Sequence, residues 1–236
     1  MKHPRWLTLF TALLRGCLFF LLSAHAVSQR ADNSIAIYGS FNDDGQIFLY
    51  PQSPDPMLRQ QTKSIGGAYG ISAAWRYRLF PTVALDVRGE YVSLEEEQLD
   101  PVATEFTHGF HVVLIQGSAL FSLPFSSERF EMYVGGGVGV YGGSRVYSVA
   151  GIEAEHVSAA PAIGIHVLVG AEFLITAGFG VRFETLFRDP QMGVENRFPQ
   201  SSVVSHGVTY HLQTETFRSN INLNGNVYSL GLCCYF

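Results

Sequence analysis

The stretch NVYSLGLCCYF, residues 226–236, alternates between two kinds of side chain, and this alternation decides the fold class. Counted back by twos from the last residue, one face is apolar or aromatic throughout: Tyr228, Leu230, Leu232, Cys234 and Phe236. The residues between them are mixed and mostly small. A period of two is typical of a β-strand whose faces meet different environments. The apolar face can belong to the core of a soluble sandwich or to the lipid-facing wall of a barrel, so the rest of the chain must decide.

Seven further segments alternate in the same way, and we expect each of them to form a strand. They are residues 34–42, 65–79, 82–92, 109–121, 130–143, 163–173 and 175–187. Long polar connections lie at about residues 43–64, 95–108, 144–158 and 189–224, and short ones at 80–82, 123–129 and 172–174. This spacing predicts an up-and-down meander with one decorated rim. The last connection alternates over residues 204–217, which predicts a hairpin above that rim, and ten strands are the alternative to eight.

The first 26 residues, MKHPRWLTLFTALLRGCLFFLLSAHA, have a basic start, an apolar middle and a small-residue end. This order is typical of a secretory signal peptide cleaved after about Ala26, so we expect one mature domain at residues 27–236. A retained anchor is one alternative, although Arg15 interrupts the apolar stretch, and a lipoprotein cleavage site before Cys17 is another. Cleavage would leave 12 basic residues against 20 acidic ones, a formal charge of 12 − 20 = −8, which argues against a nucleic-acid partner.

The residues opposite the apolar face favour a membrane barrel over a soluble one. Lys63 is the only lysine after residue 26, and it lies in a connection. The second face instead holds Gly, Ser, Ala and Tyr with a few charges of both signs, which suits the narrow interior of a closed eight-stranded barrel. In lipid, only a closed barrel lets strands pair all their backbone groups. Aromatic residues near the strand ends are expected to form two interfacial girdles: Trp75, Tyr77, Tyr91, Phe187 and Tyr228.

Two pieces of sequence carry a resemblance to a known group of proteins. They are the terminal strand ending in Phe236, and VGAEFLITAGFGVRFE at residues 169–184, which reads as a short turn with alternating flanks. In both, the chain resembles small bacterial outer-membrane barrels, the group of the OmpA transmembrane domain, OmpX and OmpW. The resemblance implies an all-β, eight-stranded antiparallel up-and-down transmembrane barrel in the outer membrane, with periplasmic termini and four long loops outside. It also implies that the outer-membrane assembly machinery recognises the last strand, where Cys234 departs from the usual aromatic or branched residue.

Charged residues in the inward phase of the strands are expected to meet inside the barrel. They are Arg76, Arg78, Asp86, Arg88, Glu90, Glu131, Glu172, Arg182, Glu184 and, as a further candidate just past the end of the last of these strands, Arg188. Buried charges must be paired, and we expect Arg76 and Arg78 to lie near Asp86 and Glu90. One interpretation is a plug of ion pairs that fills the lumen and fixes the strand register. The other is a network that rearranges to pass small solutes or ions, as rings of charge do in channels.

Histidines and glycines supply no pattern specific enough for a catalytic, cofactor or metal site, and we predict none. His166 lies in an inward phase, where a hydrogen-bonded filler is the simpler interpretation than a Ser-His-Asp arrangement acting on lipid. Five others fall in or near the predicted outer loops without the short spacing of metal ligands: His108, His111, His156, His206 and His211. The glycine-rich residues 135–143 lack the lysine and helix of a phosphate loop. The acidic residues 95–97 are simplest as a solvated loop, with a cation site bridging lipopolysaccharide as the alternative.

These observations predict a non-enzymatic protein of the bacterial outer membrane. Its expected role is structural or a surface binding or adhesion role carried by the extracellular loops. A narrow channel for small or apolar solutes is the alternative, and a lipid-modifying enzyme that uses His166 is the third. The expected partners are outer-membrane lipid and lipopolysaccharide, the assembly machinery through the last strand, and an extracellular ligand through the loops, but no nucleic acid.

Overall fold

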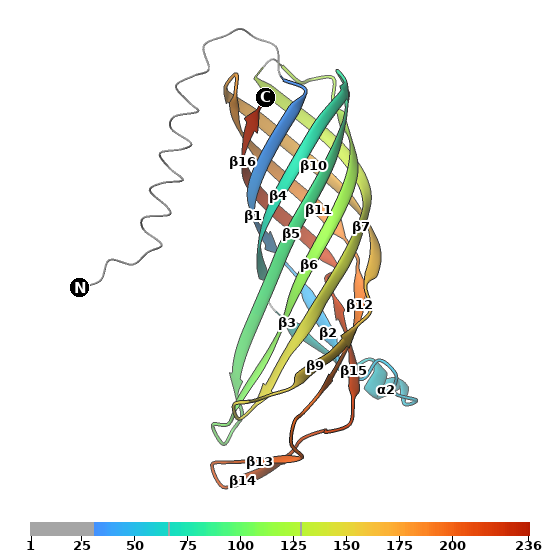
Figure 1. Ribbon diagram of the computed structural model, residues 1–236, viewed down its shortest axis with the longest axis vertical. Coiled ribbons are helices and arrows are strands. Elements are labelled where there is room, and N and C mark those ends of the chain that lie inside the picture. The colour runs from blue at the N-terminus through green and yellow to red at the C-terminus, as the bar shows by residue number, and fades with distance from the viewer. Residues whose placement is uncertain (1–30, 66, 128) are drawn as a thin grey trace, which may run out of the picture.

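The computed structural model describes residues 31–65, 67–127 and 129–236, and these residues form an almost entirely β-stranded structure (Figure 1). The signal peptide predicted for residues 1–26 lies outside the described part of the chain. A four-residue helix, α2 (Pro56–Arg59), begins after Asp55, whose carboxylate accepts a hydrogen bond of 2.9 Å from the backbone N–H of Met57. Among the described residues, no helix is long and apolar enough to cross a membrane.

Eight antiparallel strands close into a barrel. In chain order they are β1 (Asn33–Asn42), β4 (Ala68–Phe80), β5 (Val83–Leu99), β6 (Glu105–Ser122), β7 (Phe130–Val149), β10 (Ala162–Thr176), β11 (Phe179–Arg188) and β16 (Gly225–Tyr235). Each strand pairs with the next in this order, and β1 pairs with β16 to close the ring. In that closing pair Tyr38 lies opposite Gly231. The predicted eight-stranded up-and-down barrel is therefore confirmed, including the place of the last strand beside the first.

The two faces of each strand follow the predicted alternation. Outward residues leave large apolar surfaces exposed, with Ile37 at 57%, Ile71 at 60% and Ile163 at 79% exposure, whereas Tyr38 and Ser72 beside them are buried. An apolar belt of this extent around a closed barrel matches a lipid environment, because a water-exposed wall would be polar. The core of the molecule is therefore the lumen, which holds buried charged side chains together with buried apolar ones.

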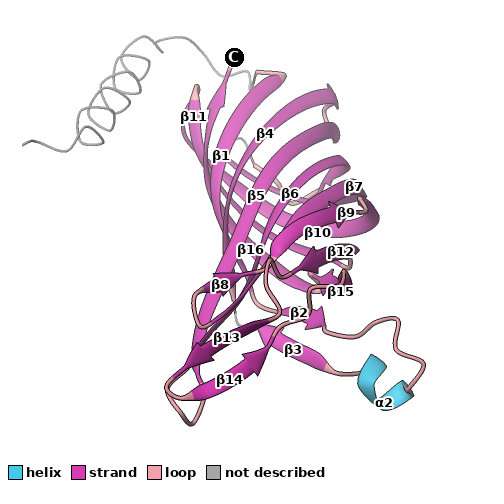
Figure 2. Ribbon diagram, turned by 60° about the horizontal axis from the view of Figure 1, so that its bottom comes forward, coloured by secondary structure: helices cyan, strands magenta, loops and turns pink. Residues whose placement is uncertain are grey.

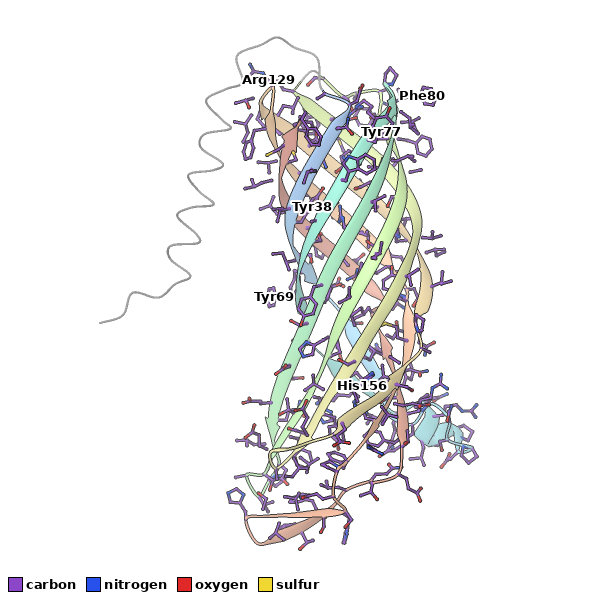
Figure 3. The ribbon with its side chains drawn as sticks, viewed as in Figure 1. Tyr38, Tyr69, Tyr77, Phe80, Arg129 and His156 are labelled. Carbon is purple, nitrogen blue, oxygen red and sulfur yellow. The ribbon has the colours of Figure 1, made fainter. Side chains whose placement is uncertain are left out.

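Aromatic residues mark two levels on the outer wall. Trp75 and Tyr77 stack with ring centroids 6.2 Å apart, and Tyr77 and Phe80 lie near the end that holds the C-terminus (Figure 3). Tyr69 lies much farther toward the opposite end, where Phe41 pairs with Tyr69 on one side and Tyr228 on the other. We take the wall between these two levels as the membrane-spanning part. The opposite end, which carries the long connections, is called the loop end below.

Three barrel strands continue well beyond the membrane-spanning part, which corrects two of the predicted loops. β5 runs to Leu99, β6 starts at Glu105, and β7 runs to Val149, so most of residues 95–108 and the first part of residues 144–158 are paired strands. The apolar alternation stops where lipid ends, but the backbone ladder does not. Glu95, for example, still pairs with Gly109. Outside lipid both faces of a strand can be polar, so the alternation disappears while the pairing remains.

The turn between β10 and β11 lies at Ala177 and Gly178, and not at residues 172–174 as the sequence predicts. The predicted strand over residues 175–187 therefore contains this turn. A register shift between Leu174 and Thr176 keeps odd-numbered residues on the outer face before and after the turn, as Phe173 and Val181 pair with each other. Because the side-chain phase does not change, the alternating pattern runs through the turn without a visible break.

The loop end carries a second sheet and a hairpin (Figure 2). The five-stranded sheet has the order β3 (Thr62–Ile65), β2 (Gly45–Phe48), β15 (Phe217–Asn222), β12 (Gln191–Arg197), β9 (Glu155–Ala159). The two-residue strand β8 (Ile152–Glu153) folds back and pairs antiparallel with the end of β7. The hairpin pairs β13 (Ser202–Ser205) with β14 (Val208–His211). Its turn residues His206 and Gly207 have φ of 48° and 79°, the left-handed values that tight hairpin turns require. The predicted hairpin within residues 204–217 is thus present, shifted toward the N-terminus.

Candidate functional site

Ion pairs fill the membrane-spanning lumen, and all ten predicted lumen charges point inward. Glu184 lies at their centre and is fully buried. Its carboxylate accepts hydrogen bonds from Arg76 Nη2 at 2.9 Å, from Arg88, and from the Tyr133 hydroxyl. Arg76 also lies 3.5 Å from carboxylate oxygens of Asp86 and Glu172. This network draws residues from β4, β5, β7, β10 and β11, so it ties opposite walls of the barrel together.

Two of the expected pairings are different in the structure. Arg78 binds Glu131 through two hydrogen bonds of 3.0 and 2.7 Å, rather than Asp86 or Glu90. Glu90 accepts a 2.9 Å hydrogen bond from Arg188, which lies on β11. Sequence order favours partners on consecutive strands, but in a narrow closed barrel the distance across the lumen is as short as the distance to the next strand. The cross-lumen pairs were therefore invisible in the sequence.

Two tyrosine rings complete the packing of this layer over neighbouring glycines. Tyr38 lies opposite Gly231, and Tyr133 lies opposite Gly170 in the adjacent strand. A Cβ atom added at either glycine would come within 2.4 Å of the tyrosine ring, so both positions require glycine while the rings stay in place. The guanidinium of Arg76 lies 4.4 Å from the ring centre of Tyr133, and that of Arg88 lies 4.3 Å from that of Tyr38.

An apolar layer lies next to the ion pairs on the side of the loop end. Buried residues of the second sheet, with Leu223 just after β15, meet inward residues of the barrel strands there. They are Ile47, Met192, Val194 and Ile221 against Val92, Phe110, Val112, Leu114 and Tyr141. The second sheet therefore inserts its apolar face into the barrel mouth. Together the two layers support the plug interpretation of the lumen charges.

His166 lies inside the barrel, as predicted, and meets a serine. Its Nε2 lies 2.7 Å from Ser118 Oγ, and both residues pair with Gly137 of the strand between them. His166 is 3% exposed and faces the lumen, on the opposite side of the wall from the apolar belt. The contact fits the hydrogen-bonded filler that the sequence suggests.

The five histidines predicted in or near the outer loops are spread over the loop end rather than gathered. His108 stacks on Tyr147 with ring centroids 4.9 Å apart. His111 stacks on Tyr91, and its Nε2 lies 3.2 Å from a carboxylate oxygen of Glu95. His206 lies in the hairpin turn, and His156 lies on β9 near the outer surface (Figure 3). Across the part of the chain that the structure describes, no three His, Cys, Asp or Glu side chains are placed to hold a metal ion together.

A cavity of about 230 Å³ lies at the loop end, and it was not predicted from the sequence. Its wall is mainly aromatic, with Phe106, Tyr147, Phe198, Tyr210 and Phe217 contributing rings. Arg145 and His108 also line it, from β7 and β6. Residues 144–158 were predicted to be a loop, so the prediction did not place Arg145 and Tyr147 on the inward face of a strand. Extending the odd-numbered inward phase of residues 131–141 along β7 would have placed both side chains inside.

The hydroxyl of Tyr210 ties the hairpin to the turn between β5 and β6, beside this cavity. The hydroxyl of Tyr210, on β14, donates a hydrogen bond to the carboxylate of Asp100 and lies 3.0 Å from Thr104 Oγ1. Asp100 also accepts hydrogen bonds from the backbone N–H groups of Val102 and Thr104. The hydrogen bond from Tyr210 lowers the pKa of Asp100, and the same bond raises the pKa of Tyr210. Both groups therefore favour the docked hairpin in the protonation states that exist at neutral pH.

Tyr210→Phe is expected to loosen the hairpin without unfolding the barrel. Because the folded pKa of Asp100 is lowered, its contribution is complete above the unfolded value of about 3.9 and is lost as the pH falls through the folded value. The raised pKa of Tyr210 removes its contribution only as the pH rises above about 10. Limited proteolysis in detergent should cut residues 199–216 faster in the variant at pH 7, and faster in the wild type at pH 3 than at pH 7. Equal cutting rates for wild type and variant at pH 7 would show that this contact does not hold the hairpin.

Comparisons with known proteins support the fold. No family model and no curated protein matches the chain. Among solved structures, the outer membrane protein OprG from Pseudomonas aeruginosa is similar with a TM-score of 0.62, over 89% of this chain and 98% of that one, at 10% sequence identity. The chain has the fold of a small outer-membrane β-barrel. This confirms the predicted fold class, and it agrees with the predicted location in the bacterial outer membrane.

Two other small barrels are similar at lower scores. Neisserial surface protein A (NspA) gives a TM-score of 0.47 at 11% identity, over 89% of this chain and all of that one. The attachment invasion locus protein Ail of Yersinia pestis gives 0.44 at 12% identity, over 88% of this chain and all of that one. At these identities the likeness concerns the fold alone, so the function must be argued from the side chains of this chain.

Proposed function

We propose that this protein is a non-enzymatic outer-membrane barrel that binds a ligand at the cell surface through its loop end. The observation that carries this proposal is the five-stranded sheet at that end. Its strands come from three separate connections: β2 and β3 follow β1, β9 precedes β10, and β12 and β15 lie between β11 and β16. Strands from three connections joined in one sheet hold a defined surface, which separate flexible loops would not do.

The filled lumen supports binding rather than transport. A channel needs a continuous polar or open path, whereas here the ion pairs around Glu184 are followed by an apolar layer around Ile47 and Ile221. In the orientation expected for such barrels, the loop end faces outside and the short turns face the periplasm. The apolar belt contacts outer-membrane lipid, lipopolysaccharide surrounds the loop-side aromatic level, and the assembly machinery reads the last strand. These partners complete the proposed role.

Deleting the hairpin tests the proposal, because the hairpin lies outside the barrel and outside the second sheet. In the variant, residues 199–216 are replaced by two glycines. Asn196 and Phe217 pair directly in the β12–β15 ladder, so a short turn can connect what remains. Wild type and variant, both in nanodiscs, are screened against extracellular matrix proteins, glycosaminoglycans and lipopolysaccharide. We expect at least one ligand to bind the wild type and to bind the variant at least ten-fold more weakly, while the variant keeps the heat-dependent gel mobility of a folded barrel.

Planar-bilayer recordings test the alternative function, a narrow channel. A binding protein with a plugged lumen should give no single-channel openings from folded wild type. Regular openings that persist in the hairpin deletion, together with no hairpin-dependent ligand in the screen, would overturn the proposed function in favour of the narrow channel.

A further inference from the structure

The loop-end cavity has an aromatic wall and a cationic floor. Tyr50, His211 and Gln213 are exposed and form its mouth, whereas Arg145, Val149 and Phe198 are buried. A cavity of about 150 Å³ is large enough to bind benzene. The 230 Å³ here therefore has room for one aromatic ring with a small substituent. Apolar walls with a few convergent polar groups are typical of sites for small molecules.

Arg145 differs from every other buried arginine among the residues that the structure describes. Arg76, Arg88, Arg182 and Arg188 each have a carboxylate oxygen within ion-pairing distance. Arg145 is equally buried, at 5% exposure, but in the described part of the chain no carboxylate forms an ion pair with it. Buried charges in proteins are normally paired, so the arrangement lacks an anion at this one place.

The neighbours of Arg145 position its guanidinium but do not neutralise it. Its Nη1 donates a 2.8 Å hydrogen bond to Ser219 Oγ, and its Nε has no hydrogen-bond partner. The guanidinium lies 4.6 Å from the ring centre of Tyr147 and 6.0 Å from that of Phe217. Burial lowers the pKa of Arg145 to about 10, so it keeps its charge at neutral pH. Burial, followed by the charge of Arg145, lowers the pKa of His108 to about 4, which leaves His108 neutral there.

We propose that this cavity binds a small aromatic carboxylate, whose carboxylate pairs with Arg145 and whose ring lies against Tyr147 and Phe217. A planar guanidinium matches the two oxygens of a carboxylate, because its N–H groups can donate two parallel hydrogen bonds to them. The surrounding rings favour an aromatic body over a sugar or a bare ion, because they offer faces for stacking and few polar groups. Neutral His108, whose buried Nδ1 has no partner, adds a second polar group to the same wall. This inference rests on the proposed surface-binding function and names the chemistry of its ligand.

Benzoate is the probe, and benzamide is its neutral counterpart of the same shape. Binding is measured by titration calorimetry with the full chain in nanodiscs, with empty nanodiscs as the blank. We expect benzoate to bind the wild type and benzamide to bind at least ten-fold more weakly. Arg145→Gln should weaken benzoate binding at least ten-fold. The control Arg197→Gln, at an exposed arginine of the same end that pairs with Glu155, should leave benzoate binding unchanged.

The comparison of the two probes on the wild type does not depend on the folding of any variant. Equal binding of benzoate and benzamide would show that Arg145 does not recognise the negative charge of the ligand. No binding of benzoate to folded wild type would overturn the inference directly. If benzoate fails while a ligand from the surface screen still requires the hairpin, the chemistry proposed here is wrong and the binding function stands. If the hairpin deletion loses no ligand but benzoate still depends on Arg145, the surface-binding role falls and the cavity remains a small-molecule site.

Discussion

Glu184→Ala is expected to be among the most damaging substitutions in this protein. Removal of the carboxylate leaves Arg88 without its closest partner and takes one of three carboxylates from Arg76, while both remain buried in the lumen. Breaking a buried ion pair by removing one partner costs about 3–5 kcal/mol. The Tyr133 hydroxyl also loses its acceptor. Urea unfolding of the barrel in lipid vesicles, followed by the heat-dependent gel shift, should show a much lower unfolding midpoint than in the wild type.

Three comparisons separate the loss of charge pairing from a general effect of substitution. Glu97→Ala removes an exposed carboxylate at the loop end and should leave the midpoint unchanged. Glu184→Gln keeps a hydrogen-bond acceptor but no charge, so it should fall between wild type and Glu184→Ala. The double variant Arg88→Met with Glu184→Met removes both charges, and it should recover part of the loss because Arg76 keeps Asp86 and Glu172. An unfolding midpoint for Glu184→Ala equal to that of the wild type would mean that the lumen network does not stabilise the barrel.

Gly137→Ala is expected to prevent proper pairing of β6 with β7. A Cβ atom at Gly137 would lie 1.8 Å from the backbone oxygen of Gly117 and 2.8 Å from Ser118 Cα. Backbone atoms of a paired strand cannot move aside as a side chain can, so the strands would have to separate. Overpacking costs about 1–3 kcal/mol where side chains can adjust, and we expect a cost at or above the upper value here. The folded fraction after refolding into detergent should fall sharply.

Gly117→Ala is the matched control for this prediction. Gly117 lies on the adjacent strand β6, one position from Ser118, the residue that pairs with Gly137. A Cβ atom there would meet nothing within 4 Å, because the position faces outward. Gly117→Ala should therefore refold like the wild type. Similar folded fractions for the two variants would contradict the close approach of β6 and β7 at Gly137.

The barrel itself was predictable because lipid imposes one chemical contrast along every strand. Outward residues such as Ile37 and Ile163 must be apolar, and inward residues such as Arg182 and Glu184 are not, so the period of two is visible in the sequence. The strand ends at the loop side were not predictable in this way. Around Glu95 and Arg145 the strands leave lipid, and the contrast between the faces disappears although the hydrogen-bonded ladder continues.

The candidate cavity was missed for a related reason. Phe106 and Arg145 come from neighbouring strands, but Phe198 and Phe217 come from the connection between β11 and β16, far along the chain. Their approach depends on how the second sheet inserts into the barrel mouth, and no local pattern records it. The same is true of Tyr210 and Asp100, whose contact docks the hairpin.

The alternating pattern was enough to predict a barrel with an apolar outside and a charged inside, with eight strands favoured over ten. Alternation is a local property, and the terminal strand carries it as clearly as any other strand. The folded structure was needed to show which charges meet, as when Glu90 binds Arg188 across the lumen. It was also needed to show which buried arginine, among the described residues, has no carboxylate beside it. Pairing inside a closed barrel depends on register and on side chains that face one another from opposite walls. Arg145 is therefore an ordinary residue in the sequence, and an uncompensated cation only in the folded protein.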